Sequence, residues 1–199
     1  MLTRNAPPSR QHGFSLLEVL VSLVLMSIGL LAIARFSMRV QNGELEATQR
    51  TQAAILVEDM AQRIYANSTN AATYVTGTSS PNSLGSGDSQ PTTCSTLAVG
   101  VLRDKCEWSN ALKGALEKSN GGTNVGGILG AIGCVEQLQA PQPSPACLPG
   151  VYMVSVAWQG LSRSVAPVGA CGQGAFGAGA NDAARRLIST QVTIGTGSC

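Results

Sequence analysis

The N-terminal part of the chain changes abruptly from polar to apolar positions. Residues 1–13 are mainly polar and basic, whereas the next 21 residues, Phe14 to Ala34, contain one charged side chain, Glu18. A run of about 20 apolar residues is long enough to cross a bilayer as a helix. A carboxylate inside such a run is energetically costly and by default indicates a function. The pattern therefore predicts a membrane helix with a functional acid near its start.

The helical pattern continues past this run and becomes amphipathic. Apolar residues recur at spacings of three, four or seven, and the charged residues fall largely on other faces. The recurring positions are Ile33, Phe36, Val40, Ala47, Ala54, Val57, Ala61 and Ile64. We therefore predict one helix from about Phe14 to about Tyr65, roughly 80 Å long at 1.5 Å per residue. A membrane anchor joined to an unrelated helix is the alternative.

The remaining residues predict a short helix and several strands. A polar linker is expected at 67–93, where it covers a sheet edge or is mobile, and a helix is expected at 107–118. The residues of that helix expected to face inward are Trp108, Leu112, Ala115 and Leu116. The expected strands are Ile132–Leu138, Val151–Trp158 and Leu187–Ile194, and a glycine-rich loop spans 160–184. A long helix followed by strands indicates the α+β class, with the helix packed on a small antiparallel sheet.

Six cysteines lie in the C-terminal half of the chain, at Cys94, Cys106, Cys134, Cys147, Cys171 and Cys199. An even number of cysteines behind an N-terminal membrane segment indicates three disulfides in an oxidising compartment. Fifteen connectivities are possible for six cysteines. We predict the sequential one, with the bridges Cys94–Cys106, Cys134–Cys147 and Cys171–Cys199.

The N-terminus differs from a secretory signal. Gly13 precedes the apolar run, and the run ends in no Ala-x-Ala-like cleavage site. Cleavage after Gly13 would remove only the basic arm and leave the helix in the mature protein. Arg4 and Arg10 precede the helix, so the positive-inside rule places the N-terminus in the cytoplasm and the C-terminal domain across the membrane. A plain signal anchor is the alternative, but it gives no reason for Glu18.

The hexapeptide Gly-Phe-Ser-Leu-Leu-Glu at 13–18, followed by an apolar helix, resembles the processing signal of type IV pilins and type II secretion pseudopilins. A longer match, from Phe14 to Leu31 and then over Glu58–Asn67, resembles the PilV branch of minor pilins. Together these segments extend over about the first third of the chain. The resemblance implies a leader at 1–13, a membrane and amphipathic helix at 14–66, and a periplasmic α+β headgroup at 67–199.

The resemblance also implies how the protein is processed and what it binds. A prepilin peptidase would cleave after Gly13 and methylate the new N-terminus, Phe14, and Glu18 would be required for assembly. We expect Glu18 to pair with the Phe14 amine of an adjacent pilin. The implied partners are other minor pilins, the major pilin, a tip adhesin, the inner-membrane assembly platform and membrane lipid. The implied location is the bacterial inner membrane, with a single pass, followed by the extracellular pilus.

The residue content argues against an enzyme. The only histidine, His12, lies in the leader, which removes Ser-His and Cys-His nucleophile pairs and nearly all zinc sites. Asp104 and Glu107, beside Arg103 and Lys105, are predicted to form a solvated charge cluster. The Gly-x-Gly-x-x-Gly pattern at 172–177 lacks the strand, helix and acid of a dinucleotide site. We expect no cofactor and no metal.

The charge balance argues against nucleic-acid binding. The net charge of +2 comes from the leader, because the rest of the chain has 11 basic and 11 acidic residues. Three functions remain open. The first is a minor type IV pilin that helps to initiate pilus assembly and has a role in surface attachment or twitching motility. The second is a type II secretion pseudopilin, and the third is a membrane-anchored adhesin or binding module. In the third case the loops at 67–93 and 160–184 would contact the ligand.

Overall fold

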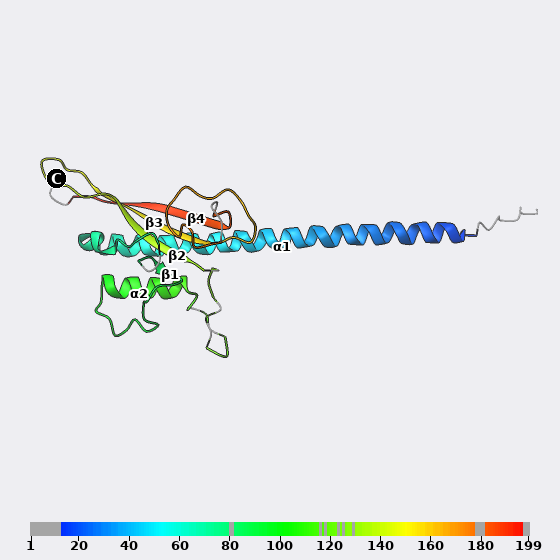
Figure 1. The fold of residues 1–199 in the computed structure, drawn as a ribbon, viewed down its shortest axis with the longest axis horizontal. Helices are drawn as coiled ribbons and strands as arrows, with labels where there is room; N and C mark the ends of the chain where they lie inside the picture. Colours follow the sequence, from blue (N-terminus) through cyan, green and yellow to red (C-terminus); the bar gives the residue numbers. More distant parts are fainter. Residues whose placement is uncertain are drawn as a thin grey trace, which may run out of the picture. The chain divides into compact units, whose positions relative to one another are not determined.

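A computed structural model describes residues 13–79, 82–115, 117, 119–122, 124, 126–128, 130–177 and 182–196 (Figure 1). The chain divides into two compact units, Met1–Glu44 and Leu45–Cys199. The elements follow in the order α1, the 3-10 helix η1, β1, α2, β2, β3 and β4. A long helix followed by an antiparallel sheet is the α+β arrangement that the sequence predicts.

The predicted long helix is confirmed as α1, Leu16–Ala66. Within the second unit it buries one face, formed by Ala53, Val57, Met60, Ala61 and Ile64. These positions are three or four residues apart, which places them on one side of a helix. The predicted face was partly wrong: Ala54 is only half-buried, and its neighbour Ala53 takes the central position.

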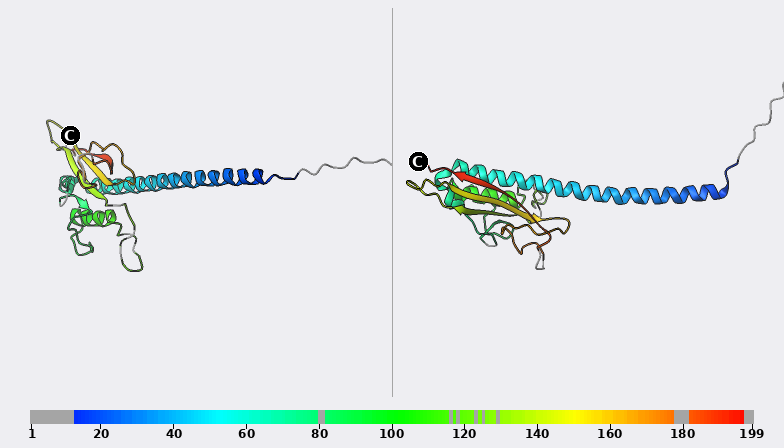
Figure 2. Two further views of the ribbon diagram at one scale, coloured as in Figure 1. Left: turned by 45° about the vertical axis from the view of Figure 1, so that its right-hand side comes forward. Right: turned by 90° about the horizontal axis from the view of Figure 1, so that it is seen from above.

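The sheet contains four strands in the order β1-β2-β3-β4, all antiparallel. Its strands are β1 (Leu84–Gly85), β2 (Ile132–Gln139), β3 (Gly150–Gln159) and β4 (Arg185–Ile194). Figure 2 shows β2, β3 and β4 beside the C-terminal part of α1. Tyr152, Val154, Val156 and Trp158 are all buried in one core with the α1 face, as their period of two predicts.

The opposite face of the sheet has a second, smaller core. It consists of Ile132, Cys134, Ala157, Cys171 and Phe176. Cys171 and Phe176 belong to the predicted glycine-rich loop, which therefore folds back over the sheet. This covering explains why Ala157 is buried although it alternates with the main-core residues of β3.

The second helix, α2, spans Val101–Leu112, which corrects the predicted range of 107–118. Trp108 and Leu112 are buried as expected, and Leu116 lies outside the described residues. The helix ends early because Gly114 adopts a φ of +71°, and a Cβ there would lie 1.1 Å from the carbonyl oxygen of Gly126. Only glycine permits this turn and this close approach.

The described residues of the segment 67–93 are held by specific contacts. It contains the 3-10 helix η1, Ser68–Tyr74, whose last residue is fully buried. Strand β1 lies in the same segment and pairs with β2, so the segment covers this edge of the sheet, which is one of the two predicted alternatives. The Asp88 carboxylate pairs with Lys113 and accepts a 2.6 Å hydrogen bond from Ser109, which anchors the segment to α2.

Two disulfides lie within the described residues. Cys94–Cys106 is present as predicted, whereas Cys134 pairs with Cys171, so the predicted Cys134–Cys147 and Cys171–Cys199 bridges are wrong. Cys134 lies five residues before the hairpin end of β2, roughly 17 Å along the strand, too far from the hairpin loop for a bridge. Cys147 is disulfide-bonded as well, and Cys199 lies outside the described residues.

Candidate processing and assembly site

The candidate processing site lies directly before the first turn of α1. Gly13, Phe14 and Ser15 have no regular secondary structure, and α1 begins at Leu16. The carbonyl of Ser15 accepts hydrogen bonds from the backbone N–H groups of Glu18, at 3.0 Å, and Val19, at 3.3 Å. The Phe14 side chain is 84% exposed. An exposed segment without regular structure directly before a helix is accessible to a protease.

Nothing in the described structure requires glycine at position 13. The backbone φ of Gly13 lies outside the left-handed region, and no heavy atom would lie within 4 Å of a Cβ added there. A side chain at this position would therefore be tolerated by the fold. A requirement for glycine at this position would have to come from a partner that binds this segment.

Glu18 lies in the first turn of α1 and is exposed. A carboxylate in the first turn interacts favourably with the helix dipole, by typically 0.3–1 kcal/mol. That contribution is smaller than the several kcal/mol that a charge costs in hydrocarbon. The helix alone therefore does not compensate for placing Glu18 in a lipid environment.

The segment of α1 that follows Glu18 exposes apolar side chains on all sides. Exposed large side chains include Leu20, Leu23, Met26, Ile28, Leu31 and Phe36. The polar hydroxyls in this stretch are satisfied within the helix, because Ser22 donates to the Glu18 carbonyl at 2.7 Å and Ser27 to the Leu23 carbonyl at 2.8 Å. Among the described helices, α1 alone is long and apolar enough to cross a membrane. Beyond its first turn, a helix pairs its backbone groups internally, which suits that environment.

A second site ties α1 to α2 through one guanidinium. Arg63 contacts the carboxylates of Asp59 at 3.1 Å, Asp104 at 3.2 Å and Glu107 at 2.8 Å. Burial lowers the pKa of Arg63, but the hydrogen bond to Glu107 and the charge of Asp59 outweigh it, so the pKa is raised overall. Asp59 and Arg63 lie in the Glu58–Asn67 segment, and Arg63 joins α1 to α2 through Asp104 and Glu107.

This arrangement corrects the predicted solvated cluster around Asp104 and Glu107. The two acids bind Arg63 of α1 rather than the neighbouring bases in sequence. Arg103 instead donates to the Leu97 carbonyl at 2.7 Å, and Lys105 donates to the Val75 carbonyl at 3.2 Å. The four neighbouring charges therefore form contacts with other segments instead of one cluster in solvent.

The raised pKa of Tyr74 predicts that the stability of the fold decreases at alkaline pH. Burial and then the hydrogen bond to Asp104 raise the pKa of Tyr74 to about 12, above about 10 in an unfolded chain. The neutral phenol therefore stabilises the fold fully below pH ~10, and this contribution, on the order of 2 kcal/mol, is lost as the pH rises toward ~12. The free energy of unfolding, measured by denaturant between pH ~10 and ~12, should fall less for Tyr74→Phe than for the wild type. Thr73→Val changes a neighbouring residue that does not titrate, so this variant should show the same fall as the wild type.

Two arginines of β4 were missed by the sequence analysis. The side chain of Arg185 is 2% exposed and donates to the carbonyls of Pro167, at 2.9 Å, and Cys171, at 3.0 Å. The Arg186 guanidinium contacts Glu46 of α1 at 2.6 Å. Adjacent residues of a strand point to opposite faces. Arg185 and Arg186 therefore form their contacts on opposite sides of the edge strand β4. The only sequence signal was two charges at the start of a strand.

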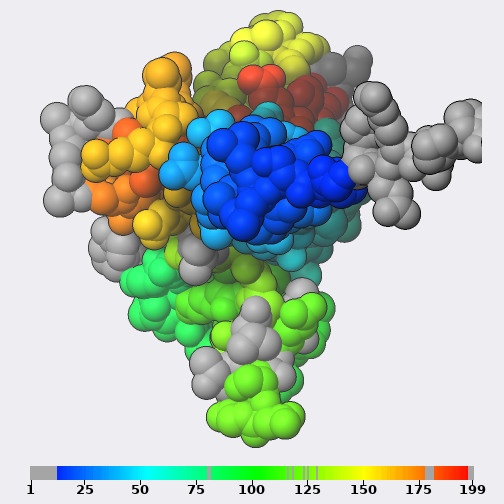
Figure 3. All heavy atoms as spheres, turned by 90° about the vertical axis from the view of Figure 1, so that its right-hand side faces the viewer, coloured from blue at the N-terminus to red at the C-terminus, as the bar shows by residue number. Residues whose placement is uncertain are grey.

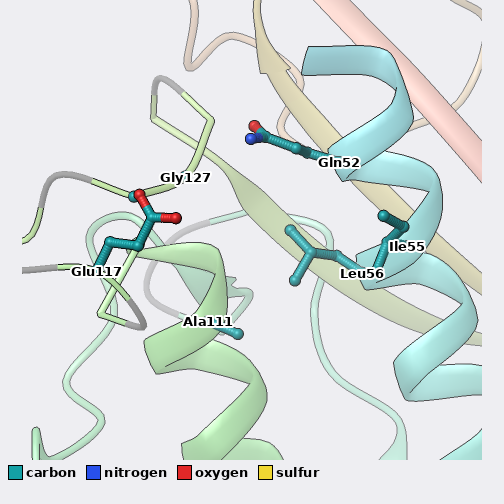
Figure 4. Close-up of a pocket in the computed structure, with 8 residues that line it drawn as sticks. Gln52, Ile55, Leu56, Ala111, Glu117 and Gly127 are labelled. Atoms are coloured by element: carbon teal, nitrogen blue, oxygen red, sulfur yellow. The ribbon is translucent and has the colours of Figure 1, made fainter. Parts of the chain in front are cut away.

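A groove runs between α1 and α2. It contains a cavity of about 160 Å³ lined by Gln52, Ile55, Leu56, Ala111, Gly114, Glu117, Gly126 and Gly127. In Figure 4, Gln52 and Leu56 project from α1 toward the side that bears Ala111 and Glu117. We call this feature the α1–α2 groove. Its floor is apolar, and Glu117 supplies a carboxylate at its edge.

The remaining sequence motifs show no catalytic arrangement among the described residues. No group of three or more His, Cys, Asp or Glu side chains there could hold a metal ion. Gly172, Gly174 and Gly177 all adopt positive φ and form irregular turns rather than a strand-to-helix junction. The turn brings Phe176 onto the smaller core, which gives these glycines a structural role.

Residues 8–34 match the family model described as the prokaryotic N-terminal methylation motif. No curated protein and no solved structure matched the chain. The matched segment contains Gly13, Phe14 and Glu18 and ends before the headgroup. Together with the long apolar helix and the four-stranded antiparallel sheet, it supports a type IV pilin-like or pseudopilin-like protein. The motif implies processing by a prepilin peptidase and fits anchoring in the inner membrane.

Proposed function

We propose that the protein is a minor type IV pilin, a structural subunit of the PilV type that helps to initiate pilus assembly and enters the pilus or its tip complex. The observation that carries the proposal is the methylation motif at residues 8–34, which includes the first part of α1, where apolar side chains are exposed on every side. Such a helix requires either lipid or the helices of other subunits around it. A filament subunit uses both environments in turn.

The role proposed for Glu18 follows from the same change of environment. A carboxylate in hydrocarbon is stabilised when it pairs with a cation. After cleavage behind Gly13, the methylated amine of Phe14 on an adjacent pilin is such a cation. The pair would set the axial register between subunits, as a buried polar group does in a coiled coil. Departure from the membrane is then favourable only beside a subunit in the correct position.

The proposed topology places the headgroup in the periplasm. Arg4 and Arg10 precede the membrane helix, which favours a cytoplasmic N-terminus. The Cys94–Cys106 and Cys134–Cys171 disulfides suit an oxidising compartment. The proposed partners are the prepilin peptidase, the assembly platform, the other minor pilins, the major pilin and a tip adhesin.

The N-terminus of the membrane protein tests this function. Mass spectrometry should find N-methyl-Phe14 at the start of the mature chain. Gly13→Val should leave more than about 90% of the protein as precursor, while the fold stays intact because a side chain fits at this position. Gly29→Ala, which also has free space around its Cβ, is the matched control and should be processed normally. An unprocessed wild-type N-terminus would contradict the proposal.

The pseudopilin is the second candidate, because the same signal and helix serve both machines. A deletion strain separates the two functions: loss of surface pili supports the minor pilin, and loss of exoprotein secretion with pili intact supports the pseudopilin. The adhesin alternative requires that pili assemble normally in the deletion strain while attachment fails.

A further inference from the structure

Two arginines follow the apolar stretch of α1 and form no ion pair with any residue that the structure describes. Arg35 comes directly after Ala34 and is the first charged residue after Glu18, and Arg39 lies four residues further on. Residues four apart on a helix are neighbours on one face. Both side chains are exposed, so α1 presents two adjacent guanidiniums on one side.

The spacing of these two arginines is unfavourable within the helix itself. Like charges four residues apart destabilise a helix, whereas an acid three or four residues away would compensate. Elsewhere in α1, Asp59 pairs with Arg63 at this spacing. The corresponding positions around Arg35 and Arg39 hold uncharged residues: Leu31, Ala32, Phe36, Met38, Asn42 and Gly43. An anion bound between the two guanidiniums would remove their repulsion.

The position of Arg35 along α1 matches the thickness of a bilayer. Arg35 follows Leu16, the first residue of α1, by 19 residues, which is roughly 28 Å of helix at 1.5 Å per residue. The hydrocarbon core of a bilayer is ~30 Å thick. With Leu16 at one boundary of that core, Arg35 and Arg39 reach the lipid phosphates at the other. The proposed topology makes this the periplasmic side, which the positive-inside rule does not favour for basic residues.

An apolar hollow lies on the same face of α1, on the N-terminal side of Arg35. Its volume is about 370 Å³, and its lining consists of Ile28, Leu31, Ala32 and Arg35. Ile28 and Leu31 are exposed, and this part of the helix is drawn in blue, facing the viewer, in Figure 3. An apolar hollow followed by two cations has the chemistry of a phospholipid site, because a lipid joins an acyl chain to a phosphate. A free phosphate would use only the guanidiniums.

We propose that Arg35 and Arg39 together bind the phosphate of one anionic phospholipid, whose acyl chain lies along Ile28, Leu31 and Ala32. Guanidinium groups suit phosphate because they offer paired N–H donors to its oxygens. A zwitterionic lipid carries its own ammonium group beside the phosphate, so it compensates the two cations less well than phosphatidylglycerol does. The proposal rests on the proposed function only in that α1 lies in a membrane before assembly. It adds a specific lipid that the subunit must release when it leaves.

Native mass spectrometry of the full-length protein tests this site. The protein is released from nanodiscs that contain equal amounts of phosphatidylglycerol and phosphatidylethanolamine, and the lipids that stay bound are counted. The wild type should retain phosphatidylglycerol at least about tenfold over phosphatidylethanolamine, as expected for a charge-assisted hydrogen bond. Arg35→Gln combined with Arg39→Gln should lower this ratio to about one. No preference in the wild type, or an equal preference in the double variant, would overturn the proposal.

Arg50→Gln is the matched control, because Arg50 is an exposed arginine of α1 that lies 15 residues beyond Arg35. This variant should keep the wild-type lipid ratio, and loss of the preference would show that overall charge, rather than this pair, selects the lipid. Circular dichroism of each variant should show unchanged helix content, because all three arginines are exposed.

Two further measurements separate a lipid from a free phosphate. Excess inorganic phosphate should not displace the retained phosphatidylglycerol, and displacement would overturn the lipid as occupant. Ala32→Trp fills the hollow while both arginines remain, so it should lower the amount of retained lipid, and an unchanged amount would overturn the placement of the acyl chain. The same samples are assayed for N-methyl-Phe14. Methylated protein without the lipid preference overturns only this proposal, and the preference with an unprocessed N-terminus overturns only the proposed function.

Discussion

Glu18→Ala is expected to lower incorporation of the protein into pili at least about tenfold, while cleavage after Gly13 continues. Each 1.4 kcal/mol of lost subunit interaction corresponds to a factor of ten, and a buried ion pair that loses one partner costs more than that. The measurement is the amount of this protein in sheared, purified pili relative to the amount in the membrane, by quantitative immunoblot. Normal incorporation of Glu18→Ala would contradict the proposed pairing with the Phe14 amine.

Two further variants separate charge from helix stability. Glu18→Gln keeps the size of the side chain and removes its charge, so it should be as defective as alanine. Ser22→Ala removes a hydroxyl that bonds only the Glu18 carbonyl in the described helix, so it should assemble normally. If Glu18→Gln assembled as well as the wild type, hydrogen bonding rather than charge would be the essential property.

Trp108→Ala is expected to destabilise the second unit by about 3–5 kcal/mol, as large-to-small changes of a buried aromatic typically do. Trp108 is fully buried, and its indole N–H donates to the Leu56 carbonyl of α1 at 2.8 Å. The substitution leaves a cavity where α2 packs on α1 and the sheet. Denaturant unfolding of the full chain in detergent, followed by circular dichroism, measures the loss.

The matched control for Trp108→Ala lies on the outer face of the same helix. Leu102 is 63% exposed, so Leu102→Ala should change the free energy of unfolding by less than about 0.5 kcal/mol. A similar loss in both variants would contradict the packing account, because alanine is the best helix former and neither substitution lowers helix propensity. In that case the core described around Trp108 would not determine the stability of the unit.

The elements with strong periodicity could be predicted from the sequence. The spacing of apolar residues identified α1 over nearly its full length, and the alternation from Tyr152 to Trp158 identified β3 and its buried face. These patterns reflect a single repeating constraint, burial of one face. The processing signal was equally visible, because its contiguous residues 13–18 require no knowledge of the fold.

The features that were missed depend on contacts between distant segments. The Cys134–Cys171 bridge forms because the loop around Phe176 folds back over the sheet, which no local pattern reveals. The early end of α2 depends on the close approach of Gly114 and Gly126. Arg63 gathers acids from two helices. In each case a partner more than ten residues away decides the local outcome.

The packing of α1 into the core of the second unit has a mechanical consequence. Its last turns contribute Ala53, Val57 and Ile64 to the main core and are bound to Glu107 through Arg63. A pull along this segment would therefore have to shear a whole packed face at once, rather than peel away one contact after another. In the proposed filament, this arrangement would let the subunit withstand tension along the fibre.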